Sequence, residues 1–136
     1  MNRSMLLVYQ LLAGASDSAT GSLLLIAPAF TLRLMQLHAP PAAMVYLSFV
    51  GAFMFAVGLA YLYGAYVVAC NGSIRRLEMV WLLTAFTGTS VAAFVISQVL
   101  TSELEAGWLM VALIDGALVL IQAIGFRKGW LANVAK

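Results

Sequence analysis

Long apolar stretches alternate with short polar or proline-containing breaks along this chain. The apolar stretches cover residues 5–27, 44–69, 79–100 and 106–126, and each reaches the ~20 residues that a membrane-spanning helix needs. Backbone amides inside a bilayer must find their hydrogen-bond partners within the segment, so helices rather than open strands are expected. The pattern predicts an all-α fold, with residues 1–136 forming a single integral membrane domain, a bundle of four transmembrane helices.

Prolines and one glycine mark the expected ends of these helices. Pro28 is expected to end the first helix, because the residue before a proline is disfavoured in helical conformation. The segment 30–37 is predicted to lie along the membrane interface before Pro40 and Pro41 turn the chain. At the other end of the chain, Gly129 is expected to stop the last helix just after its final basic residues.

The overall composition also indicates a membrane protein. Apolar residues make up 64% of the chain and charged residues only 9%, whereas soluble domains have about 45–50% and about 25%. So little polar surface argues against a soluble enzyme, a nucleic-acid-binding protein or a disordered regulator. The predicted surroundings are therefore the lipid bilayer, and no nucleic acid is expected as a partner.

Most positive charges fall on one side of the predicted bundle. Six of the seven Lys and Arg residues precede the first helix, lie in the second loop or follow the fourth helix: Arg3, Arg75, Arg76, Arg127, Lys128 and Lys136. The first loop carries Arg33, and the third loop carries Glu103 and Glu105 instead. By the positive-inside rule, both termini are predicted to face the cytoplasm, in a multi-pass protein of the bacterial inner membrane.

Several aromatic residues are expected at the membrane interfaces. Trp81, Trp108 and Trp130 lie at or just beyond the ends of predicted helices. A tyrosine cluster near the inner end of the second helix consists of Tyr61, Tyr63 and Tyr66. Tryptophan and tyrosine are enriched where a bilayer meets water, so an interfacial belt is predicted for both groups.

The beginning of the chain has a second interpretation. Arg3, the apolar run 5–12 and the small residues 13–15 are also typical of a cleavable signal peptide. Apolar character resumes at residues 23–30, however, and cleavage would leave a piece too short to span a membrane. We therefore expect the segment to be retained as the first helix.

Two aspartates stand out within the apolar stretches. Asp17 lies about halfway along the first predicted helix and Asp115 about halfway along the fourth, and no Lys, Arg or His lies within any span. An aspartate at the centre of a spanning helix costs about 2.5–3.5 kcal/mol, and such residues usually face the interior of a bundle. We predict that Asp17 and Asp115 form a protonatable site between these two helices that binds a proton, a cation or a small amphipathic molecule.

Further polar residues lie on the same helix faces as the aspartates. Gln10 and Gln122 are each seven residues, or two helical turns, from an aspartate. If the first and fourth helices are adjacent, as we expect, Asp17 pairs with Asp115 in one polar layer and Gln10 pairs with Gln122 in another. Two hydroxyl side chains complete the predicted binding site: Ser18 and Thr20.

Other roles for the aspartates stay open. Two protonated acids could hydrogen-bond and lock the bundle in register, or one acid could contact a partner protein. The second helix carries small residues at a spacing of four, which predict a packing seam for a homodimer or a larger membrane complex: Ala52, Ala56, Ala60 and Gly64. The alternative functions are therefore an accessory subunit or anchor with a purely structural aspartate pair, and a small proton-coupled exporter that acts as a dimer.

Residues for catalysis or metal binding are scarce. Cys70 is the sole cysteine and His38 the sole histidine, so neither a disulfide nor a histidine pair for haem or metal is expected. The sequence contains no glycine-rich phosphate loop and no serine-nucleophile motif. We predict a non-enzymatic protein without a metal or cofactor.

Three stretches of the chain have a residue pattern similar to that of a known family: residues 14–28 followed by Leu32-Arg33-Leu34, residues 51–58, and residues 108–122. Together they resemble the small four-helix bacterial membrane proteins of the DoxX-like or unknown-function type, a resemblance that implies a fold and no catalytic residue. Asp17 followed by Gly21-Ser22 is similar to the small multidrug-resistance transporters, which have one essential acid in their first helix. Those transporters carry a glutamate there and no acid matching Asp115, so the likeness implies transport without assigning a residue.

Overall fold

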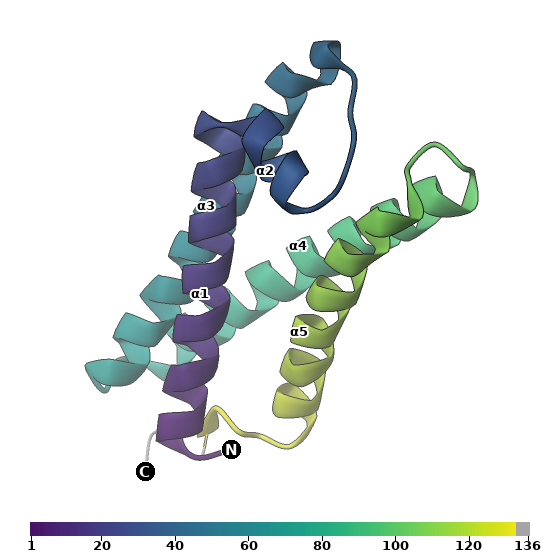
Figure 1. Ribbon diagram of the computed structural model, residues 1–136. Helices are drawn as coiled ribbons and strands as arrows, with labels where there is room; N and C mark the ends of the chain where they lie inside the picture. The colour runs from purple at the N-terminus through teal and green to yellow at the C-terminus, as the bar shows by residue number, and fades with distance from the viewer. Residues whose placement is uncertain (133–136) are drawn as a thin grey trace.

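Helices are the only regular elements in the computed structural model, which describes residues 1–132. The four long helices are α1 (Arg3–Ile26), α3 (Met44–Ala69), α4 (Ile74–Leu100) and α5 (Leu109–Arg127) (Figure 1). Three short helices lie between them: α2 (Pro28–Leu34), η1 (Pro41–Ala43) and η2 (Ala106–Trp108). The all-α prediction is confirmed.

The number of membrane spans differs from the prediction. Within the described residues, three helical segments are long and apolar enough to cross a membrane: Pro41–Ala69, Ile74–Leu100 and Ala106–Arg127. α1 is long enough, but most residues from 16 to 22 are serine, threonine or aspartate, and they interrupt its apolar character. The prediction of four transmembrane helices is therefore wrong, because the polar middle of α1 removes it from the set.

The ends of the helices differ from the predictions at one main point. α4 begins at Ile74 rather than at residue 79, so Arg75 and Arg76 belong to the helix and not to a loop. The predicted interfacial segment 30–37 overlaps α2, and its position at a membrane interface stays a prediction. At the end of α5, Gly129 has a φ of 62° and follows the cap residue, so this glycine stops the helix as predicted.

Glycines hold α1 against α3 in an antiparallel pair. A Cβ atom added at Gly21 would overlap the backbone nitrogen of Phe55 and lie 2.9 Å from the carbonyl oxygen of Gly51. A Cβ atom at Gly58 would overlap the backbone of Ser18 in the same way. Two helix backbones approach this closely only where side chains are absent, which is the reason small residues mark such interfaces. We call these contacts the glycine seam.

α4 and α5 form a second antiparallel pair. The two pairs meet near the turn between α3 and α4 and diverge toward the opposite end (Figure 1). α1 and α5, the first and fourth predicted helices, do not pack along their lengths. They approach where the Tyr9 hydroxyl donates a hydrogen bond to the carbonyl oxygen of Leu118 at 3.2 Å. The prediction that these helices are adjacent is therefore wrong, because the glycine seam pairs α1 with α3.

The predicted small-residue seam of α3 is divided between two faces. Gly64 is buried against Gln10 of α1, whereas Ala52 and Ala56 are exposed and Ala60 is half-buried. Positions four apart rotate by about 40° at each step around an α-helix, so four of them in a row drift away from a single face. Ala52 and Ala56 are left on the outer surface of the α1–α3 pair.

The hydrophobic core lies where the two helix pairs meet. The side chain of Trp81 is 0% exposed, and its ring centroid lies 5.7 Å from that of Tyr9 and 5.6 Å from that of Phe126. A buried cluster drawn from α1, α3, α4 and the segment after α5 surrounds it: Leu6, Val67, Val68, Leu77 and Leu131. Trp81 is therefore a core residue of the bundle, and Trp130 packs partly buried against the same cluster; their depth relative to a membrane interface stays a prediction.

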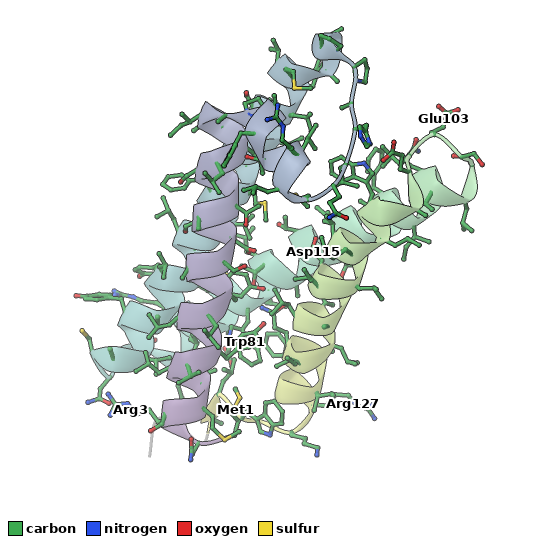
Figure 2. The ribbon with its side chains drawn as sticks, viewed as in Figure 1. Met1, Arg3, Trp81, Glu103, Asp115 and Arg127 are labelled. Carbon is green, nitrogen blue, oxygen red and sulfur yellow. The ribbon has the colours of Figure 1, made fainter. Side chains whose placement is uncertain are left out.

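Charged residues separate toward the two ends of the molecule. Arg3 donates hydrogen bonds to the carbonyl oxygens of Val68, at 3.0 and 3.2 Å, and of Ala69, at 2.9 Å, at the end of α3. Arg3 and Arg127 lie at one end of the molecule and Glu103 lies at the other (Figure 2). We call the first the cationic end; it carries Arg3, Arg75, Arg76, Arg127 and Lys128. Lys136, assigned to the same side from the sequence, lies outside the described residues.

Candidate functional site

A cavity of about 150 Å³ lies between the two helix pairs and is lined by all four long helices. Most of its wall is apolar, including Phe53, Val57, Val91 and Trp108. Carboxyl and hydroxyl groups come from the following lining residues: Asp17, Thr20, Tyr61, Thr84, Thr87 and Asp115. No lysine, arginine or histidine is among the residues that line it. The cavity therefore combines an apolar wall with acidic groups that lack a positive counterpart.

The two carboxyls reach the cavity from helices that do not pack along their lengths. Asp17 of α1 is 7% exposed and Asp115 of α5 is half-buried. Among residues 1–132, no hydrogen bond joins the two carboxyls, and neither accepts one from another group. Burial raises the pKa of the Asp17 carboxyl to about 6, and the nearby charge of Asp115 adds to the increase. The packed chain thus leaves both carboxyls available to a ligand.

Buried polar side chains form one end of the cavity, nearer the cationic end, and we call them the polar floor. The Gln122 carboxamide nitrogen donates to the hydroxyl of Thr84 at 2.6 Å and to that of Tyr61 at 3.3 Å. The Gln10 carboxamide is oriented by its neighbours: its oxygen accepts from the Trp81 indole nitrogen at 2.7 Å, and its nitrogen donates to the Tyr61 carbonyl oxygen at 3.3 Å. The polar floor therefore ties α1, α3, α4 and α5 together.

The six residues predicted for the site fall into three groups. Asp17, Thr20 and Asp115 line the cavity, whereas Gln10 and Gln122 are completely buried in the polar floor. Both glutamines bond to Tyr61, and within residues 1–132 no hydrogen bond joins them directly, so they share one buried layer without the predicted direct pairing. The remaining residue, Ser18, packs against Gly58 in the glycine seam, and its buried hydroxyl has no hydrogen-bond partner.

Tyr61 is the main site residue that the sequence interpretation missed. Its side chain is buried in the bundle, whereas those of Tyr63 and Tyr66, with which it is predicted to form an interfacial belt, are exposed. Tyr61 lies three residues from both Gly58 and Gly64, so it shares the face of α3 that meets α1. That spacing was the signal that could have placed it in the core.

A short segment after α2 connects the two helix pairs at the other end of the cavity, and we call residues 35–38 the strap. Met35 lines the cavity, and Leu37 is buried so close to Gly107 that a Cβ atom there would lie 2.7 Å from Leu37 Cδ2. The His38 Nδ1 atom lies 3.6 Å from a carboxylate oxygen of Glu105. The strap therefore reaches from the α1–α3 pair to the connection between α4 and α5, at the end of the cavity opposite the polar floor.

Comparison with known proteins gives no independent guide to function. No family model, curated protein or solved structure matches this chain. The resemblances to DoxX-like proteins and to small multidrug-resistance transporters therefore stay predictions. Within residues 1–132, no group of three or more His, Cys, Asp and Glu side chains could hold a metal ion.

Proposed function

We propose that this chain is a small, non-enzymatic membrane protein that binds a small amphipathic amine in the cavity between its helix pairs. The observation that carries the proposal is the placement of Asp17 and Asp115 in one largely apolar cavity without a cationic side chain. Binding sites for small molecules typically combine an apolar wall with a few polar groups that orient the ligand. The aspartates would bind the protonated amine, and the apolar wall would hold the hydrocarbon part.

The volume of the cavity limits the ligand. An apolar protein cavity of ~150 Å³ is large enough to hold benzene, and the cavity here is about 150 Å³. A single ring or a short branched chain fits this space, with its amine directed toward Asp17 and Asp115. Benzylamine is therefore a suitable probe, and benzyl alcohol is its matched neutral control.

The amine preference can be measured on the purified full-length chain in lipid nanodiscs. We expect benzylamine to bind at least about tenfold more tightly than benzyl alcohol, because a hydrogen bond to a charged group is worth about 1.5–3 kcal/mol. Ligand-observed NMR titrations at pH 7.5 give both affinities, and empty nanodiscs correct for partition into lipid. Equal affinities for the two probes would contradict the proposal.

For its location, the proposal is the bacterial inner membrane with the cationic end facing the cytoplasm. Three apolar helices support a membrane location, and clustering of arginine and lysine at one end favours the cytoplasmic side for that end. Alkaline phosphatase fused to the C-terminus is then expected to be inactive, whereas the same enzyme inserted at Glu103 is expected to be active. The reverse pattern would exclude this orientation.

An accessory subunit or anchor of a larger membrane complex is a second candidate function. It is favoured by the exposure of Ala52 and Ala56 on α3, since small residues let a second helix approach closely. In this case the aspartates would be structural. A proton-coupled exporter that acts as a dimer would instead use both the aspartates and the exposed small residues of α3. Ala56→Leu is then expected to reduce the size of the purified assembly in mild detergent; an unchanged size would exclude this face as the contact.

A further inference from the structure

A second hollow lies at the cationic end and shares no residue with the aspartate cavity. It is a groove of about 530 Å³ between the end of α3 and the beginning of α4. Its polar part comes from Ser73, Arg75 and Arg76, and its apolar part includes Tyr63, Met79 and Leu83. The groove is therefore a separate surface whose chemistry differs from that of the cavity.

Charged and apolar groups follow one another in order along this groove. Arg75, Met79 and Leu83 are spaced by four residues and lie on one face of α4. The side chains of Met79 and Leu83 are 65% and 61% exposed, so the chain itself does not cover them. Because α4 is apolar enough to span a membrane, its arginines lie at one end of a span and the exposed apolar wall runs from there into the bilayer depth.

The two arginines of the groove have no acidic partner. Within the described part of the chain, Arg75 and Arg76 make no ion pair and no side-chain hydrogen bond, whereas Arg3 is engaged by the carbonyl oxygens of α3. Glu78 follows closely in α4 but does not line the groove. The lining of the groove therefore carries two positive charges and no negative one.

The start of α4 adds to this positive character. Ser73 occupies the N-cap position without making a side-chain capping hydrogen bond, so the first amide groups of α4 have no side-chain acceptor. The helix dipole places partial positive charge at the same point. A group with several oxygen acceptors and negative charge is the chemical complement of this end of the groove.

We propose that the groove binds an anionic phospholipid, with the phosphate at Arg75 and Arg76 and an acyl chain along Tyr63, Met79 and Leu83. Guanidinium groups match phosphate oxygens with two parallel hydrogen bonds. Basic pockets between helices at the membrane surface bind anionic lipid headgroups. The two positive charges of the lining select an anionic lipid over a zwitterionic one, and the apolar wall selects a lipid over free phosphate. This site does not depend on amine binding in the cavity.

Native mass spectrometry of the full chain in detergent tests the lipid site. Dioleoyl phosphatidylglycerol is the anionic probe and dioleoyl phosphatidylcholine is the zwitterionic control with the same acyl chains. We expect at least about fivefold tighter binding of the anionic lipid. The double variant Arg75→Gln with Arg76→Gln is expected to lose that preference, and both side chains are exposed, so the fold should not depend on them.

A matched variant removes the same charge from the same end. Arg127→Gln with Lys128→Gln lies outside the groove and is expected to keep the preference for phosphatidylglycerol. An equal loss in both double variants would mean that the overall charge of the cationic end attracts the lipid, which would overturn the site. Displacement of the bound lipid by millimolar inorganic phosphate would show that the groove binds phosphate itself, and would overturn the lipid assignment.

Discussion

Replacing both cavity aspartates, Asp17→Asn with Asp115→Asn, is expected to lower the affinity for benzylamine by at least about tenfold while leaving the affinity for benzyl alcohol unchanged. Asparagine keeps the shape of the side chain but removes its charge, so the effect reports the charged contact alone. The expected loss of affinity follows from the free energy of a hydrogen bond to a charged group, about 1.5–3 kcal/mol. NMR titration of both probes against both proteins measures it.

A control variant tests whether the effect on amine affinity is specific to the cavity aspartates. Glu103→Gln removes an acid in the turn after α4, at the end of the molecule opposite the cationic end (Figure 2), and is expected to leave both affinities unchanged. If the double aspartate variant changes the stability of the protein but not its amine affinity, the aspartates are structural.

Amine binding is also expected to weaken as the pH falls through about 6. Burial raises the pKa of the Asp17 carboxyl to about 6, so this side chain is charged above that pH and becomes neutral below it. The amine stays protonated throughout the range from pH 7.5 to 5. The titratable groups that line the cavity with Asp17 are Tyr61 from α3 and Asp115 from α5. The weakening therefore follows the loss of negative charge in the cavity, and an affinity independent of pH would exclude a role for the Asp17 charge.

The largest loss of stability is expected from a single methyl group in the glycine seam, Gly21→Ala. Its Cβ atom would overlap the backbone nitrogen of Phe55 and lie 2.9 Å from the carbonyl oxygen of Gly51. Backbone atoms cannot rotate away as a side chain can, so α1 and α3 must separate. We expect the free energy of unfolding to fall by about 2–3 kcal/mol, at the upper end of the usual range for overpacking. Thermal unfolding in detergent, followed by circular dichroism, measures the change.

Gly116→Ala provides the matched comparison on α5. A Cβ atom at Gly116 meets nothing within 4 Å, and alanine favours a helix over glycine by up to about 1 kcal/mol. This variant is therefore expected to be as stable as the original protein or slightly more stable. If Gly21→Ala also left the stability unchanged, the close approach of α1 and α3 would not be a feature of the folded protein.

The positions of the helices could be predicted from the sequence, but the pairing of the helices could not. Apolar length locates the long helices, and prolines mark the breaks on either side of α2, because these signals depend on local residues alone. The pairing of α1 depended on two competing signals, the aspartates that pointed to α5 and the glycines that fit α3. The structure satisfies both: Gly21 packs on α3 while Asp17 faces a cavity that Asp115 also lines.

The polar floor shows a further limit of sequence interpretation. Gln10 and Gln122 could be placed in the interior from their spacing to the aspartates, and both are fully buried. Their hydrogen-bond partners could not be foreseen, because Tyr61 and Trp81 near helix ends are equally consistent with a membrane interface. Only the relative rotation of α3 and α4 decides which aromatic side chains point inward.

The glycine seam also has a mechanical consequence. Because the backbones of α1 and α3 are in direct contact, neither helix can rotate or slide against the other without a clash, so the two form one rigid unit. The α4–α5 pair contacts this rigid unit around Trp81 and, at its far end, through Leu37 and His38 of the strap. It is therefore held at both ends of the cavity, so the cavity can widen only if the contacts around Trp81 or those of the strap are broken.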